Sequence, residues 1–383
     1  MVARKWSMVG ALSLILIVAL ASWAAPAAAG SSHQDAPFEV VASGLNNPRG
    51  LAFTSSGDDL LVAEAGMGGD GPCFDGPEGR ACLGNSGAIA RVDLSSGSVE
   101  RVVTGLSSLG LVEPPGFNAT GPHDVAPIGD NQFYVVMGLG GTPTVRANLG
   151  EGAALFGHLL RVRQGGAPES IADLAAFEVA NDVDGAGPDS NPYSLAVRSD
   201  RLFVVDAGAN TLDAVDFDGR VQVSVMLPSR MVPAPPFIQP APPGGQIPMQ
   251  AVPNSAAVGP DGAIYVGQLT GFPFPVGGAN VYRIGANGEA EIYASGFTNI
   301  IDIAFDRQGN LYVLEIAKDS LLAATSGPPV GRLVRVAKGS NTQTVLLSEG
   351  LIAPAGLLVD DDAIYVSNFG VFPGDGQIVR IRR

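Results

Sequence analysis

Apolar and polar positions recur in one frame along the chain, and the clearest copy of this frame is Val252–Gly271. The segment reads as a proline, a short apolar run, a Gly-Pro-Asp-Gly turn, a second apolar run and then an abrupt polar residue. Two apolar runs of strand length around a glycine-containing turn predict a β-hairpin. The frame recurs in five further segments, which are Asn47–Gly66, Gly121–Gly138, Asn191–Gly208, Asn299–Ala317 and Ala353–Gly370.

Each hairpin is followed by a third apolar strand, such as the GAIARV, ANVYRI and GQIVRI runs, and most are followed by a fourth. A four-strand unit that repeats at intervals of tens of residues is typical of a β-propeller. Phe38–Leu45 resembles a fourth strand but precedes the first repeat, whereas the last repeat has no fourth strand. We therefore expect an all-β, six-bladed propeller over residues 38–383, in which the N-terminal strand completes the last blade and closes the ring. The inner strands are predicted to begin near Pro48, His123, Pro192, Pro253, Ile300 and Pro354.

Connection lengths predict that one face of the ring is plain and the other is elaborated. Turns between first and second strands are short, while the long segments lie between second and third strands or between blades. These two kinds of junction open on the same end of an up-and-down ring, and loops on a rigid frame commonly carry function. The proline-rich segment Ser229–Met249 is predicted to cover this face, although such a segment can also serve as a ligand for a partner.

The first 29 residues are predicted to be a cleaved signal peptide. Arg4 and Lys5 precede the apolar run Met8–Ala24, and Ala27–Ala29 fits a cleavage site. The alternative is an uncleaved anchor. Residues 30–37 are expected to be a flexible N-terminus, and the mature protein is expected to be a secreted or periplasmic monomer with no membrane span.

The charge of the chain narrows the range of its partners, and its cysteine content indicates a disulfide. The formal net charge is −15, which disfavours nucleic acid as a partner. The only two cysteines, Cys73 and Cys82, share one loop, so export favours a local disulfide between them.

Polar residues end most of the second strands and begin most of the first strands, and both sets are expected to converge on the axis. The strand ends contribute Glu64, Asp206, Gln268, Glu315 and Asn368, with Met137 as the exception. The strand starts contribute Arg49, His123, Asp124, Tyr193, Asn254, Asn299 and Asp302. The alternative interpretation is that these residues satisfy loop amides and fill a wet channel.

Clustered carboxylate and amide oxygens suit a hard cation such as Ca²⁺. We assign Glu64, Asp206 and Asn368 as possible metal ligands, with His123 and Asp124 as possible catalytic groups for acid–base hydrolysis. Asp182, Asp184 and Asp189 resemble a calcium loop faintly. The acid that an EF-hand needs at its twelfth position is missing there, so only a looser calcium site fits.

Several stretches together resemble the ScyD/ScyE family, which is named for exported proteins encoded in the cyanobacterial gene cluster for the pigment scytonemin. They are NNPRGLAF, the Cys73–Cys82 loop, DSNPYSLAV, LTGFPFPVGGANVYRI and GFTNIIDIAF. The resemblance covers nearly all of the mature chain and implies an exported six-bladed propeller similar to NHL-type repeats. It implies no activity. By position and chemistry alone, the ring is also similar to calcium-dependent lactonases of the gluconolactonase type and, more weakly, to quinoprotein sugar dehydrogenases.

Three hypotheses follow from these patterns. The first is a secreted binding or accessory propeller that recognises a small molecule or protein partner at its elaborated mouth. The second is a calcium-dependent hydrolase or lactonase, and the third is a purely structural envelope protein. In the first hypothesis Arg49, Tyr193, Asn254, Gln268, Asn299, Asp302 and Glu315 are the ligand-binding residues.

Overall fold

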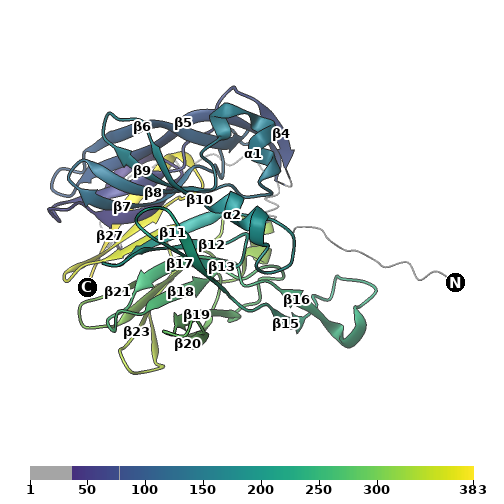
Figure 1. Cartoon of the computed structure of the whole chain (residues 1–383). Helices are drawn as coiled ribbons and strands as arrows, with labels where there is room; N and C mark the ends of the chain where they lie inside the picture. Colours follow the sequence, from purple (N-terminus) through teal and green to yellow (C-terminus); the bar gives the residue numbers. More distant parts are fainter. Residues whose placement is uncertain (1–36, 77) are drawn as a thin grey trace.

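The computed structural model describes residues 37–76 and 78–383, and this part of the chain forms a six-bladed β-propeller (Figure 1). The predicted signal peptide and residues 30–36 lie outside the described residues. In the described part of the chain, five of the six blades are four-stranded up-and-down sheets, and the sheet of blade 1 has one additional short strand. Their inner strands contact one another in the cyclic order β2, β7, β11, β17, β21, β25 and back to β2, which confirms the predicted closed ring.

The first three blades follow the chain in order. Blade 1 consists of β2 (Pro48–Phe53), β3 (Asp59–Glu64), β5 (Gly79–Asp93) and β6 (Val99–Leu111), with the short β4 (Cys73–Gly76) paired to β5. Blade 2 consists of β7 (Pro122–Gly129), β8 (Gln132–Met137), β9 (His158–Arg163) and β10 (Glu169–Asp173). Blade 3 consists of β11 (Pro192–Val197), β12 (Leu202–Asp206), β13 (Thr211–Val215) and β14 (Val221–Met226).

The remaining three blades complete the ring. Blade 4 consists of β17 (Pro253–Val258), β18 (Ile264–Gln268), β19 (Ala279–Ile284) and β20 (Ala290–Phe297). Blade 5 consists of β21 (Ile300–Phe305), β22 (Leu311–Glu315), β23 (Arg332–Val336) and β24 (Gln343–Leu347). Blade 6 consists of β25 (Gly356–Val359), β26 (Ala363–Asn368), β27 (Pro373–Arg382) and β1 (Glu39–Asn46). The inner strands begin within two residues of their predicted starts.

The second strand of each blade is apolar on both faces because each blade packs between two neighbours. All five residues of β12 and all five of β22 are buried. Large buried side chains such as Tyr282 and Tyr312 fill the space between blades 4, 5 and 6. The continuous apolar runs that marked the hairpins in the sequence are thus the consequence of packing on two sides.

The N-terminal strand closes the ring as expected. β1 pairs antiparallel with β27, from Glu39 opposite Arg380 to Leu45 opposite Gly376. Leu45 is fully buried, and Arg380 donates to the Glu39 carboxylate at 2.6 Å. Because the first and last segments of the described chain share one sheet, the outer edge of β27 is paired rather than open.

One face carries all of the additional elements, as the connection lengths predict. Between second and third strands lie α1 (Thr144–Leu149), the 3₁₀ turn Glu151–Ala153 and the 3₁₀ helix Leu321–Ser326. Between blades lie α2 (Leu174–Asn181), the 3₁₀ turn Pro243–Gly245, and the ribbon of β15 (Arg230–Pro233) and β16 (Gln246–Met249). In the described part of the chain, no helix has the length and hydropathy required to cross a membrane.

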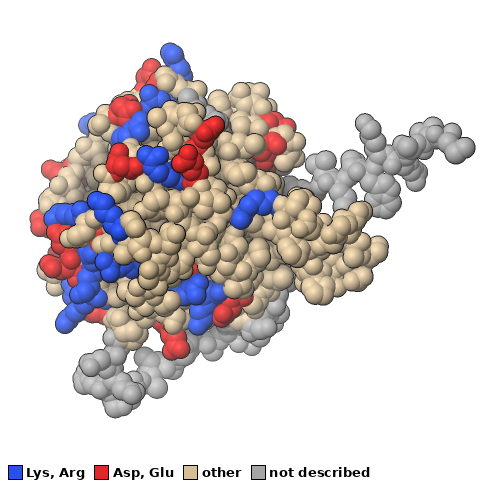
Figure 2. Space-filling model, turned by 90° about the horizontal axis from the view of Figure 1, so that it is seen from below, with Lys and Arg blue, Asp and Glu red and all other residues tan. Residues whose placement is uncertain are grey.

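The β15–β16 ribbon and its tip form an uncharged arm, defined as Met231–Met249. The arm projects from the body in Figure 1, and in Figure 2 it shows no acidic or basic side chain beyond its base. Phe237 near its tip is 63% exposed, and its ring lies 6.3 Å from that of Phe272. The arm therefore meets the body beside the mouth of the ring, on the elaborated face.

Candidate functional site: the mouth of the central channel

A cavity of about 210 Å³ opens among the elaborated loops around the ring axis. Its polar floor comes from one position of the repeat, the second residue of the inner strand. This position supplies Arg49 in β2, His123 in β7, Tyr193 in β11 and Asn254 in β17, and blade 5 contributes Ile301. In blades 1 to 4 the residue before it is a proline that fixes the start of the strand. The structure therefore brings together four of the predicted site residues.

Arg49 is the central charged group of the floor, and it is only 5% exposed. One terminal nitrogen donates to Asn118 Oδ1 at 3.2 Å and to the Ala119 carbonyl at 3.0 Å, while the other lies 3.5 Å from the Tyr193 hydroxyl. Its Nε is buried and has no hydrogen-bond partner. Arg49 also forms no salt bridge with any residue in the described ranges. A buried guanidinium without a carboxylate partner is costly unless another group compensates its charge.

His123 is a neutral imidazole. Its Nδ1 lies 3.1 Å from the Pro192 carbonyl, which can only accept, so Nδ1 carries the proton and Nε2 is left as an acceptor. Burial, and then the charge of Arg49, lowers the pKa of His123 to about 3. The ring packs 4.8 Å from Tyr193 and lies against Gly138, where an added Cβ would come within 2.0 Å of the imidazole.

Asp124 and Asp302 occupy the next position of the repeat, and they join neighbouring blades. Asp124 accepts from the Leu195 amide of blade 3, and Asp302 accepts from the Leu357 amide of blade 6, each at 2.7 Å. Burial raises the pKa of Asp124 to about 6. Burial, together with repulsion from Asp124, raises the pKa of Asp302 well above its usual range. Neither residue lines the cavity. The main role of both carboxyl groups is therefore to hold neighbouring blades together.

The remaining walls of the cavity are largely apolar. One side comes from the β4–β5 hairpin, through Phe74 and Ala81, and the other from the loops of blades 4 and 5, through Phe272, Phe274 and Leu321. These apolar residues were not identified from the sequence. The LTGFPFPVG run that marked the family resemblance holds two of them, Phe272 and Phe274.

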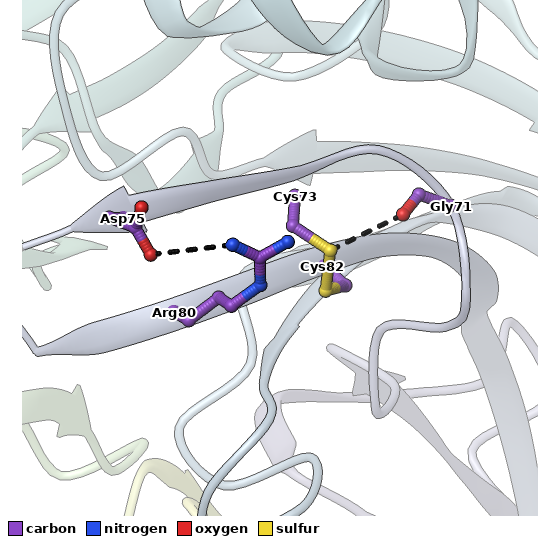
Figure 3. Close-up of a disulfide and its surroundings, with 5 residues drawn as sticks. All are labelled: Gly71, Cys73, Asp75, Arg80 and Cys82. Atoms are coloured by element: carbon purple, nitrogen blue, oxygen red, sulfur yellow. Dashed lines mark hydrogen bonds and ion pairs between the residues drawn. A yellow bond between two sulfur atoms is a disulfide. The ribbon is translucent and has the colours of Figure 1, made fainter.

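The predicted disulfide between Cys73 and Cys82 is present, and it links the two strands of the β4–β5 hairpin (Figure 3). The two cysteines are directly opposed in the β4–β5 register. Glu78, in the turn of this hairpin, accepts from Asn118 Nδ2 at 2.9 Å. Asn118 therefore connects the hairpin to Arg49, which fixes the wall of the cavity relative to its floor.

The polar strand ends point into their own blades instead of lining the cavity. Glu64 accepts from the Asn46 amide at 2.7 Å and pairs with Arg101 at 2.8 Å. Glu315 accepts from the Thr298 amide at 2.8 Å and pairs with Arg332 at 2.6 Å. In both blades a buried carboxylate thus joins the segment just before the inner strand to a strand farther out, which is the fourth strand β6 in blade 1 and the third strand β23 in blade 5.

The amide and aspartate strand ends act in a similar way. Asn368 accepts from the Ile352 amide at 2.7 Å, and Asp206 accepts from the Asn191 amide at 2.6 Å. The Gln268 side chain accepts from Asn280, and Asn299 bonds Leu269 and Leu321. The predicted metal ligands Glu64, Asp206 and Asn368 therefore sit in three separate hydrogen-bond networks, as the loop-amide interpretation expects.

A second group of acids lies beside blade 3, where the sequence showed a faint calcium loop. Glu178, Asp182 and Asp184 hold carboxylate oxygens within 4.8 Å of one another. Burial raises the pKa of Glu178 to about 8, and repulsion from Asp206, Asp184, Asp182 and Asp213 acts in the same direction. Asp189, the third acid noted in the sequence, lines the mouth cavity instead, and burial raises its pKa to about 6.

No family model and no curated protein matches this chain. Solved structures of other propeller proteins are similar in fold. Virginiamycin B lyase from Staphylococcus aureus, solved as a catalytically inactive form with quinupristin, has 12% identity and a TM-score of 0.47 over 90% of this chain and 98% of its own. The calcium-binding protein regucalcin from Agrobacterium tumefaciens has 11% identity and a TM-score of 0.48 over 89% and 92%. The PQQ-bound aldose sugar dehydrogenase from Streptomyces coelicolor has 14% identity and a TM-score of 0.49 over 89% and 96%. Likeness at this level carries no argument about ligand or chemistry.

Proposed function

We propose that this chain is an exported binding propeller whose mouth cavity holds a small molecule with an apolar body and a carboxylate or similar acceptor group. The observation that carries this proposal is Arg49. Its guanidinium is buried at the floor of the cavity and is not paired to a carboxylate of the described chain. A ligand carboxylate would supply the missing charge, and a buried charge-assisted hydrogen bond is stronger than a neutral one.

At the floor the charge of Arg49 favours an anion, whereas the two acids that line the cavity, Glu78 and Asp189, belong to its walls. The neutral His123 and the Tyr193 hydroxyl add polar groups without adding negative charge to the floor. The apolar wall of Phe74, Phe272 and Phe274 would then remove the rest of the ligand from water. A mostly apolar cleft with a few convergent polar groups is the usual form of a small-molecule site.

The size of the cavity limits the ligand. At about 210 Å³ the cavity is smaller than the ~300–1,000 Å³ of pockets for drug-sized ligands, which favours a small ligand. This is space for one six-membered ring with a carboxylate, while a longer ligand would extend toward the arm. Phe237 of the arm contacts Phe272 at the rim and offers such a ligand a further apolar surface.

Export is part of the proposal, and the Cys73–Cys82 disulfide supports it because such bonds persist in oxidising compartments. Membership of the ScyD/ScyE family is proposed on the sequence resemblance alone. The proposal includes no role in pigment formation.

A screen of matched acids and methyl esters tests the proposed ligand class. We expect small aromatic and alicyclic monocarboxylates to raise the melting temperature of the protein, whereas their uncharged esters do not, because only the acids pair with Arg49. A ligand present at a hundred times its Kd stabilises the fold by about 2.7 kcal/mol. Equal shifts for acids and esters, or no shift with any compound, would contradict the proposal.

A hydrolase of the lactonase type is the second candidate function. The observation in its favour is that Asp124, whose pKa is about 6, directly follows His123 in β7, and perturbed carboxyl groups occur often in active sites. A calcium-dependent form would use Glu64, Asp206 and Asn368 as ligands, and these side chains would first have to leave their present hydrogen bonds.

A panel of lactones and esters tests this second function. If Asp124 is a general base, turnover should rise as the pH increases through about 6, because only the ionised carboxylate accepts a proton. Asp124→Asn should remove that rise, and chelation should reduce turnover if a cation takes part. Lack of turnover over the whole panel at pH 5–9 would eliminate the hydrolase.

A further inference from the structure

We propose that Glu178, Asp182 and Asp184 form a calcium site that holds the loop after α2 against blade 3. The site is separate from the mouth cavity, and its existence does not depend on the ligand proposed above. α2 lies in the connection between blades 2 and 3, next to β10 and β11 (Figure 1). Glu178 and Asp182 are one helical turn apart, and Asp184 follows in the turn that ends the helix.

The geometry of the three carboxylates fits one cation. One oxygen from each lies within 4.8 Å of the others. Two ligands on opposite sides of Ca²⁺ are about 4.6–5.2 Å apart, since each lies ~2.3–2.6 Å from the ion. Mg²⁺ keeps several of its waters and is seldom held by a dedicated set of protein carboxylates, which favours Ca²⁺ here. All-oxygen ligands also favour Ca²⁺ over zinc or copper.

The independent observation is the state of Glu178. The residue is 2% exposed, and its Oε1 is shielded from solvent without a hydrogen-bond partner. A shielded carboxyl group that has an unpartnered oxygen and lies beside two other carboxylates is unfavourable unless a bound proton or a cation compensates it. A bound cation would satisfy this oxygen and remove the repulsion among the three acids together.

Backbone amides around the cluster orient the carboxylates of Asp182 and Asp184, but they carry no positive charge that would neutralise them. Asp182 Oδ1 accepts from the Gly187 amide at 3.0 Å, and Asp184 Oδ1 accepts from the Ala186 amide at 2.8 Å. Asp184 Oδ2 accepts from Asn210 of blade 3 at 2.8 Å. The cluster also lies at the C-terminal end of α2, where the partial negative charge of the helix favours a cation.

The position of the loop indicates what calcium would do. The chain continues from this loop to Asp189 and Asn191, both of which line the mouth cavity. Calcium would therefore join the end of α2 to blade 3 and hold one wall of the cavity in place. The role of the calcium ion would therefore be structural.

Glu178→Gln separates this account from a simple loss of stability. Without calcium, the variant should melt close to the wild type, because glutamine keeps the size of the side chain and the raised pKa of Glu178, about 8, leaves the wild-type group largely uncharged at neutral pH. With calcium at up to ~5 mM, above the 10⁻⁴–10⁻³ M range of extracellular calcium modules, the wild type should gain a few degrees and the variant should gain nothing. Asp184→Asn should also lose the response, and Glu151→Gln, an exposed acid on the same face, should keep it.

Isothermal titration with calcium alone gives the direct measurement. The wild type should bind one equivalent, and Glu178→Gln should bind none. The proposal is overturned if the wild type shows neither heat nor a melting shift at 5 mM calcium. It is also overturned if Glu178→Gln keeps the calcium response, or if magnesium gives the same shift as calcium.

Discussion

A chain that lacks β1, residues 39–46, is expected to lose cooperative folding and to aggregate. β1 supplies the fourth strand of blade 6, and without it the backbone of β27 is an unpaired edge open to other chains. The deletion also removes the fully buried Leu45 from the packing between blades. Replacing a buried leucine by alanine alone costs about 2–5 kcal/mol. Loss of the entire strand is therefore expected to exceed the usual net stability of a domain, ~5–15 kcal/mol, when the lost pairing is included.

Circular dichroism and size-exclusion chromatography would measure this effect. The matched control is a chain that begins at residue 37 and keeps β1, which should melt like the mature protein. A synthetic peptide of residues 38–46 should partly restore the folded monomer to the truncated chain. Cooperative unfolding of the truncated chain at the control's melting temperature would show that the ring does not need this strand.

Arg49→Met is expected to weaken binding of the best acid from the screen by roughly tenfold to hundredfold. A hydrogen bond to a charged group contributes about 1.5–3 kcal/mol, and each 1.4 kcal/mol corresponds to a factor of ten in Kd. Methionine keeps much of the apolar volume of the side chain but removes the charge and the donors. The affinity for the matching methyl ester should change little, because the ester does not pair with the guanidinium.

Two further variants control for indirect effects of Arg49→Met. Arg49→Lys keeps the charge but loses the planar donor fork, so it should retain part of the affinity. Arg91→Met removes an arginine that donates to Asp130 on the plain face, and it should bind the acid like the wild type. Unchanged affinity in Arg49→Met, with the fold intact, would remove Arg49 from the site.

The ring and its closure could be predicted from the sequence because both depend on a repeated pattern. Pro48, Pro192 and Pro253 mark the starts of inner strands, since proline fixes the backbone where the ladder begins. The surplus strand at the start and the missing strand at the end determined how the ring closes. The same repetition placed Arg49 and His123 on the floor of the mouth.

The direction of the strand-end side chains could not be predicted in the same way. Glu64 and Glu315 occupy equivalent positions, yet their role depends on Arg101 and Arg332, which come from the outer and third strands of their blades. A carboxylate at the end of a strand can face the axis or turn back into its own blade. A cationic partner on a neighbouring strand decides between these two directions.

Glu178 was missed because no helix was expected between blades 2 and 3. A calcium loop of the EF-hand type takes its last acid from a position after Asp182 and Asp184, whereas the structure supplies an acid from the preceding helical turn. The spacing of Glu178 and Asp182, four residues apart, was a signal available in the sequence. It becomes informative only once that segment is known to be α-helical.

A crystal structure of the protein with the strongest-binding acid would test the central claim most directly. We expect the carboxylate within hydrogen-bond distance of Arg49, with the apolar body of the acid against Phe272 and Phe274. An acid bound on the plain face or on an outer strand, with the mouth cavity containing only water, would contradict it.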